Sequence, residues 1–235
     1  MDHDFWIQRW QNNRLGWHLP EVHPLLVKFF PRFSLTSGDS VFVPLCGRSQ
    51  DMVWLAEQGM QVIGNEISPI AIEGFFATQQ LQPVRAESGK LVRWQAGPYT
   101  LYEGDYFDLI PEHVNDVKFV HDRAALIALP REGESGRKAY MRQMRNLFAA
   151  DVQTLLITLG YDQSVMNGPP FSVGYEEVIW HYAFDHIIEF LVDEEILDQE
   201  PKFRERGLQQ LTEWAFMMTR YDPAYAAFSD SPQDF

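Results

Sequence analysis

The stretch Val41-Phe42-Val43-Pro44-Leu45-Cys46-Gly47-Arg48-Ser49, residues 41–49, decides the fold of this 235-residue chain. Its first four residues form the short apolar run of a buried strand, and a loop follows them. A helix is expected over about 51–58, and Gln61-Val62-Ile63-Gly64-Asn65-Glu66 is typical of a second strand. Ser68-Pro69 then supplies an N-cap and a first-turn proline for a helix to about Gln79. This order of elements predicts an α/β fold.

The alternation of strands and helices continues to the end of the chain. We expect strands at 91–95, 99–103, 117–122, 152–159, 187–192 and 214–220, the first two as a hairpin or as separate short strands, and helices at 137–148 and 175–184. Such alternation implies a mainly parallel sheet with ligands outside the carboxyl ends of its strands. The site should therefore lie in the loops 45–50, 66–69, 105–109, 122–130 and 161–171.

Two amphipathic helices are predicted within residues 1–33, joined by a turn at Leu15–Pro20, ahead of the first strand. No repeat, low-complexity tract or linker divides the chain. We therefore expect one domain over 1–235, with residues 1–35 as a helical extension.

Composition narrows the range of partners. Thirty-three acidic against nineteen basic residues give a net charge of −14, which repels nucleic acid and anionic membranes and leaves room for a local basic pocket. Cys46 is the only cysteine, so no disulfide forms within the chain, and it is expected to be a packing residue. Residues 1–6 show no apolar leader pattern, no stretch approaches the length of a membrane span, and the histidines show no metal-ligand spacing. We therefore expect a cytoplasmic protein without a metal, and we also expect a monomer.

The first two strands also suggest the kind of ligand. Glu66 ends the second strand 19 residues after Gly47, where a carboxylate usually accepts hydrogen bonds from ribose hydroxyls; a solvated or helix-capping Glu is the alternative interpretation. The loop after the first strand has a single glycine, and a pyrophosphate needs several. This disfavours a nicotinamide dinucleotide and favours S-adenosylmethionine, against whose apolar parts Leu45 would pack.

Several blocks of the chain match one known family in the correct order. They are Phe5–Trp10, Val43–Ser49 with Asp51–Ala56, Gly64–Ser68, Asp122–Pro130, and Tyr161–Gln163 with Gly168–Val173. Through them the chain resembles the thiopurine S-methyltransferases, whose bacterial members also look like methylators of selenium and tellurium oxyanions. The resemblance covers nearly the whole chain.

The resemblance implies a class I S-adenosylmethionine-dependent methyltransferase, Rossmann-like, with seven strands, the last antiparallel, and the N-terminal helices closing over the cofactor. It further implies that Trp10, Leu45, Glu66 and Arg123 contact the cofactor and that Asp105-Tyr106 faces the adenine. Trp17 and Phe171 fall in segments that border the acceptor pocket. The acceptor is then a small thiol or a similar soft nucleophile, such as a thiopurine or an aromatic thiol.

The sequence departs from the family pattern at Asn65, where an apolar residue is common, at Gly160, where Asp is expected, and in the glycine-rich loop 131–138. No catalytic acid or base is expected, because a soft anionic acceptor needs positioning more than deprotonation. Two alternatives stay open: a non-catalytic S-adenosylmethionine-binding protein, and a methyltransferase with an oxygen or nitrogen acceptor and Asp122 as its base.

Overall fold

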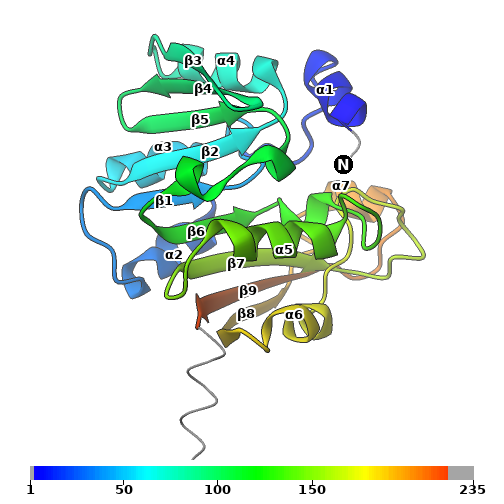
Figure 1. Cartoon of the computed structure of the whole chain (residues 1–235). Coiled ribbons are helices and arrows are strands. Elements are labelled where there is room, and N and C mark those ends of the chain that lie inside the picture. The colour runs from blue at the N-terminus through cyan, green and yellow to red at the C-terminus, as the bar shows by residue number, and fades with distance from the viewer. Residues whose placement is uncertain (1–2, 222–235) are drawn as a thin grey trace, which may run out of the picture.

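A computed structural model describes residues 3–221 of the chain, and their nine strands form one sheet (Figure 1). The strand order is β3-β4-β5-β2-β1-β6-β7-β9-β8. The strands are β1 Ser40–Val43, β2 Gln61–Glu66, β3 Val84–Ser88, β4 Leu91–Ala96, β5 Tyr99–Glu103, β6 Val117–Arg123, β7 Gln153–Gly160, β8 His186–Glu195 and β9 Thr212–Arg220. The helices are α1 His3–Gln11, α2 Pro24–Phe29, α3 Gln50–Glu57, α4 Pro69–Thr78, α5 Arg137–Leu147, α6 Tyr175–Tyr182 and α7 Pro201–Glu205.

Five strands, β5-β2-β1-β6-β7, pair in parallel at the centre of the sheet. β9 pairs antiparallel with both β7 and β8, as expected for the last strand. The sheet has nine strands instead of the expected seven, because a β3–β4 hairpin extends it beyond β5. β3 was not predicted: its residues Val-Arg-Ala-Glu-Ser lack an apolar alternation, and Val84 is exposed on the edge.

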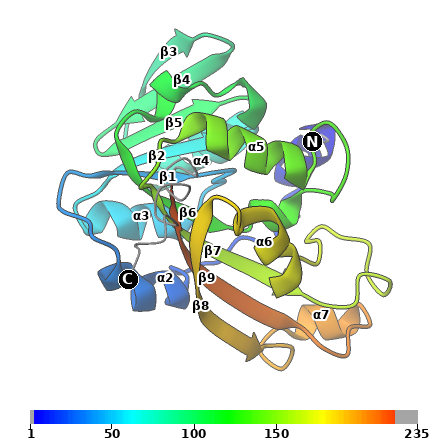
Figure 2. The same ribbon diagram turned by 60° about the horizontal axis from the view of Figure 1, so that its bottom comes forward.

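Helices cover both faces of the sheet, as the sequence predicts. Side chains alternate along β1, so that Val41 and Val43 face α2, α3 and α4, whereas Phe42 faces α5 and α6. Figure 2 shows α5 and α6 on the same side of the sheet. All three β1 side chains are almost fully buried, so this strand forms the centre of both cores.

The N-terminal helices occupy different places. α2 packs against the sheet with Leu25, Leu26 and Phe29. α1 lies beyond the end of the sheet, where the short helix α7 also lies (Figure 1). Lys202 of α7 donates to the backbone carbonyl of Gly16 at 3.0 Å, which joins the N-terminal segment to the C-terminal part of the chain. Both meet at the carboxyl ends of the parallel strands, the position expected for a ligand site.

Candidate active site

A cavity of about 420 Å³ lies at the carboxyl ends of the central strands, under the N-terminal segment. Its volume is within the range of small-molecule sites. Four of the five predicted strand-end loops contribute to its wall, through Leu45, Glu66, Arg123 and Pro169 among others. The loop 105–109 is the exception. The strand-end loops named from the sequence therefore converge on one cavity, with that single exception.

The loop after β1 forms the floor of the cavity. Leu45 has a φ of +46°, an uncommon conformation for a leucine, and Gly47 has a φ of +54°. Cys46 N–H donates to the Asn65 carbonyl at 2.8 Å, which holds this loop against the end of β2. Ser49 caps α3 by accepting from Asp51 N–H at 3.1 Å. Strained backbone of this kind concentrates at ligand sites, so the position of Leu45 supports a binding role for the loop.

The Glu66 carboxylate lies between two strand-end loops. Its Oε2 accepts from Gly47 N–H at 3.0 Å, and its Oε1 accepts from Ser68 N–H at 2.8 Å. The residue is 5% exposed and lines the cavity. Burial raises the pKa of the Glu66 carboxyl to about 7, against the backbone hydrogen bonds, which lower it. Ile67 N–H adds a third backbone hydrogen bond to this carboxylate, which leaves it capacity for a further hydrogen bond from a ligand.

Aromatic side chains of the N-terminal segment close the cavity from above. Trp10 and Trp17 meet edge to face, with ring centroids 5.9 Å apart, and Trp6 meets Trp17 in the same way at 5.1 Å. All three line the cavity. Trp10 packs over Gly47, where a β-carbon would come within 3.1 Å of the indole ring. A larger residue at 47 would displace Trp10, so this glycine is needed for close approach as well as for its backbone conformation.

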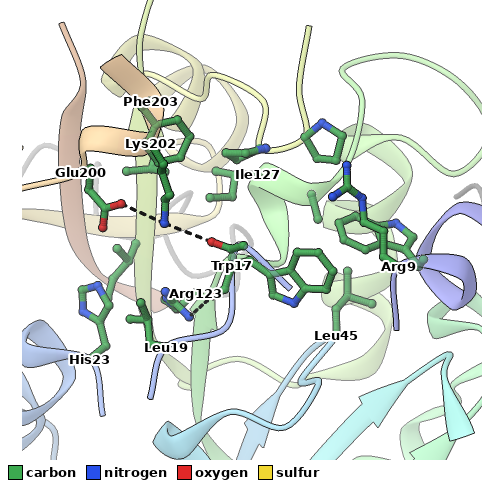
Figure 3. A pocket seen from close by; sticks show the side chains of 18 of the residues that line it. Arg9, Trp17, Leu19, His23, Leu45, Arg123, Ile127, Glu200, Lys202 and Phe203 are labelled. Atoms are coloured by element: carbon green, nitrogen blue, oxygen red, sulfur yellow. Dashed lines mark hydrogen bonds and ion pairs between the residues drawn. The ribbon is translucent and has the colours of Figure 1, made fainter. Parts of the chain in front are cut away.

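Arg123 ends β6 and reaches into the cavity. Its guanidinium donates to the Trp17 carbonyl at 3.3 Å, so it touches the N-terminal segment (Figure 3). Burial lowers the pKa of Arg123, while the charges of Asp51, Glu213 and Glu200 raise it. The next residue, Ala124, has a φ of +68°, a second strained position on the cavity wall.

The cavity wall gathers positive charge in an acidic protein. Four cationic side chains line it, Arg9, Arg123, Lys202 and Arg206, against three carboxylates, Glu66, Glu200 and Glu213. Figure 3 shows Arg9 at one end of the cavity and Arg123 with His23 at the other. The local balance therefore favours a ligand that carries some negative charge.

Five of the eight predicted site residues line this cavity: Trp10, Trp17, Leu45, Glu66 and Arg123. Asp105, Tyr106 and Phe171 do not form its wall. Tyr106 is 1% exposed and stacks on Tyr140 in the core, with centroids 4.8 Å apart. Phe171 packs its ring against Gly168 and donates its N–H to the Ile127 carbonyl, and Pro169 and Pro170 line the cavity instead.

Asp105 lies close to the cavity without forming its wall. Gly104 N–H donates to the Glu66 carbonyl at 3.0 Å, and the Asn65 side chain donates to the carbonyls of Tyr102 and Gly104 at 3.1 Å each. These bonds hold the start of the 105–109 segment beside the end of β2. They also explain Asn65, because a buried apolar side chain could not make them.

Several cavity residues were missed by the sequence analysis. Phe203, Lys202 and Arg206 come from α7 and the residue following it, and His23 and Glu213 come from the start of α2 and from β9. Pro201 at the first turn of α7 was a usable sign of a helix start. Nothing local in the sequence places these distant segments at one cavity. Within residues 3–221, no group of three or more His, Cys, Asp or Glu side chains could hold a metal ion.

Comparison with solved structures defines the class. The fold resembles phosphoethanolamine N-methyltransferase 2 of Haemonchus contortus, solved with S-adenosylhomocysteine, with a TM-score of 0.61 at 10% identity over 84% of this chain and 53% of that chain. An S-adenosylmethionine-dependent methyltransferase from Anabaena variabilis gives 0.58 at 15% identity, over 93% and 95% of the two chains. The chain therefore has the fold of the S-adenosylmethionine-dependent methyltransferases.

The sequence comparisons define the family. The family model of thiopurine S-methyltransferase (TPMT) matches residues 1–221, and the chain belongs to this family. A Bordetella petrii thiopurine S-methyltransferase is 46% identical over 221 residues, 94% of this chain and 99% of the relative. One from Methylococcus capsulatus is 43% identical over 219 residues, 93% and 97% of the two chains. The chain is thus a methyltransferase with S-adenosylmethionine as methyl donor, as the sequence predicts.

Within the same described residues, no helix is long and apolar enough to cross a membrane.

Proposed function

We propose that this protein transfers the methyl group of S-adenosylmethionine to the sulfur of thiopurines or of other aromatic and heterocyclic thiols, with selenium and tellurium oxyanions as a second group of acceptors. Family membership and the names of the relatives support a thiopurine-type acceptor. The single structural observation that carries the proposal is a cavity lined by both aromatic rings and arginines. Such a wall suits a planar ring with a polarisable, partly anionic sulfur atom.

We assign cofactor binding to Trp10, Leu45, Glu66 and Arg123. The Glu66 carboxylate, fixed by Gly47 and Ser68, would accept the ribose hydroxyls. Leu45 would pack against the apolar part of the ligand, and Trp10 above Gly47 would face its cationic sulfonium. The 105–109 segment, held beside β2 by Asn65, would border the adenine through Asp105 and its backbone, with Tyr106 supporting it from the core.

We assign the acceptor to the part of the cavity bounded by Trp17, Arg123 and Pro169, with the ring of Phe171 packed against Gly168 of the same loop. The bound donor supplies a methyl group on a good leaving sulfur, and the transfer is an in-line displacement. The protein's contribution is to hold the reactants in line and to exclude water beneath the aromatic N-terminal segment.

Two measurements on the purified protein test this function. Isothermal titration with S-adenosylhomocysteine should give micromolar binding, and a coupled assay for its production should show turnover with an aromatic thiol, a thiopurine or selenite. Binding without turnover on any of them would instead support the non-catalytic alternative. A protein that binds no S-adenosylhomocysteine would contradict the proposal outright.

A further inference from the structure

His23 and Glu213 form a polar pair on the cavity wall that the cofactor assignment does not use. His23 Nε2 lies 3.3 Å from Glu213 Oε1, and their side chains are 7% and 16% exposed. Both line the cavity, on the side where Arg123 enters it. Figure 3 places His23 beside Leu19 and Arg123, at the opposite end from Arg9.

The surroundings fix the orientation of the imidazole. His23 Nδ1 accepts the backbone N–H of Leu25 at 3.3 Å, where His23 is the N-cap of α2. The ring proton of a neutral His23 therefore sits on Nε2 and points at Glu213. The backbone N–H of His23 donates to Asp51 Oδ1 at 2.7 Å, and Asp51 Oδ2 is 3.0 Å from His121 Nε2. Asp51 and His121 are almost fully buried, so the backbone of His23 is held by a buried hydrogen-bonded pair.

Glu213 itself faces several charges. Arg123 of β6 interacts electrostatically with it, and Glu200 and Lys202 line the same cavity from the start of α7, where they pair with each other at 2.9 Å. His23 engages Oε1 of Glu213, and within residues 3–221 the other oxygen, Oε2, has no hydrogen bond or ion pair. A carboxylate with one oxygen held and one open to a cavity has the geometry of a proton acceptor.

We infer that Glu213, oriented by His23, is the general base that deprotonates acceptor thiols that are neutral at physiological pH. The inference rests on the proposed function. The S–H proton passes to Glu213 Oε2, and a sulfur lone pair forms the new bond to the methyl carbon. The bond from that carbon to the sulfonium breaks, its electron pair stays on the donor sulfur, and Glu213 later releases the proton to water. Arg123 stabilises the transient thiolate.

The test compares two acceptors that differ in ionisation. 4-Nitrothiophenol is a thiolate at pH 7, whereas benzyl mercaptan, like the thiol of cysteine with a pKa of about 8.5, is mostly protonated. Glu213→Gln should lower kcat with benzyl mercaptan by about 100-fold or more and leave kcat with 4-nitrothiophenol within about threefold. The loss with benzyl mercaptan should shrink as the pH rises above the thiol pKa. Affinity for S-adenosylhomocysteine should not change.

Two further variants keep the test decisive. Glu200→Gln removes a neighbouring carboxylate of the same cavity and should affect both thiols equally. His23→Asn keeps an N-cap side chain for α2 but removes the Nε2–H, and it should reproduce the thiol-dependent loss at about three- to tenfold, even if Glu213→Gln fails to fold. Equal losses with both thiols, or none with either, would overturn the inference. If the wild-type protein methylates neither these two thiols nor a thiopurine or selenite, the proposed function fails instead.

Discussion

The indole ring of Trp214 on β9 lies against the backbone of Gly160 at the end of β7. A β-carbon built on residue 160 would come within 2.0 Å of the ring. The two strands pair antiparallel, with Thr158 opposite Trp214 and Gly160 opposite Thr212, so the ring leans diagonally across the pair. Gly160 stands where the family resemblance leads us to expect Asp. The departure is explained by Trp214, whose ring fills the space of a side chain at 160.

Gly160→Ala should therefore destabilise the fold by about 1–3 kcal/mol, because the ring of Trp214 must move to make room. Trp214→Leu should lose packing but remove the clash, so the double variant should be more stable than the sum of the two single effects predicts. Urea unfolding of all four proteins measures the coupling. Additive effects would show that the close approach has no energetic weight.

The sequence was most informative where the pattern is local. The strand–loop–helix units around 41–79 were predicted to within a residue or two, because buried runs, the Ser68-Pro69 start and single glycines act over a few residues. The hairpin of β4 and β5 was also anticipated. The edge strand β3 was missed because an exposed strand paired on one side carries little hydrophobic signal.

The site could be predicted only in part. Glu66 and Leu45 could be predicted because ligands bind at the carboxyl ends of parallel strands, whereas the predictions for Trp10 and Arg123 required the family resemblance. His23 and Glu213 are 190 positions apart in the sequence. They meet at the cavity wall only because α2 packs against the sheet and β9 pairs with β7. Tyr106 shows another limit: its position after a strand does not tell whether the ring faces a ligand or the core, and the ring is buried in the core.

Binding of S-adenosylhomocysteine should depend on the ionisation of Glu66. With the Glu66 pKa near 7 in the ligand-free protein, and with ribose hydroxyls donating to the ionised form, affinity should fall by about tenfold for each pH unit below 7. Above pH 8 it should be constant. Calorimetric titration from pH 5.5 to 8.5 measures this affinity. Repeating it in two buffers with different ionisation enthalpies gives the number of protons released on binding.

Glu66→Ala provides the control for that titration. It should bind more weakly at pH 8 and lose most of the pH dependence, since no titrating group remains at the ribose position. The exposed Glu57 of α3 should behave differently, and Glu57→Ala should keep the wild-type profile. A pH dependence that survives in Glu66→Ala would assign the titration to another group.

Asp122 should make the free energy of unfolding depend on pH, because its pKa is raised in the folded protein. Burial raises the pKa of this carboxyl to about 6, although Tyr140 O–H and Leu126 N–H donate to it at 2.7 and 3.2 Å. The folded state favours the protonated form of Asp122. Its contribution to the free energy of unfolding is therefore fully present below about pH 4 and is lost as the pH rises through 6. Asp122→Asn should gain up to about 3 kcal/mol relative to wild type between pH 4 and pH 8, as measured by urea unfolding.

The same variant bears on the acceptor. The Asp122 side chain is buried against Tyr140 and does not line the cavity, so Asp122→Asn should retain turnover with an aromatic thiol within a few-fold. A collapse of turnover in a protein that still binds S-adenosylhomocysteine would favour an oxygen or nitrogen acceptor with Asp122 as its base.

Trp10 should distinguish the charged donor from the neutral product. If its indole faces the sulfonium, Trp10→Leu removes a cation–π contact of about 0.5–2 kcal/mol that S-adenosylhomocysteine cannot make. The variant should thus lose about two- to thirtyfold more affinity for S-adenosylmethionine than for S-adenosylhomocysteine, as measured by titration with each ligand. Trp180, 82% exposed on α6, is the matched control, and Trp180→Leu should change neither affinity. Equal losses for both ligands in Trp10→Leu would mean that the ring contributes shape and closure of the cavity, through its packing over Gly47, and no charge recognition.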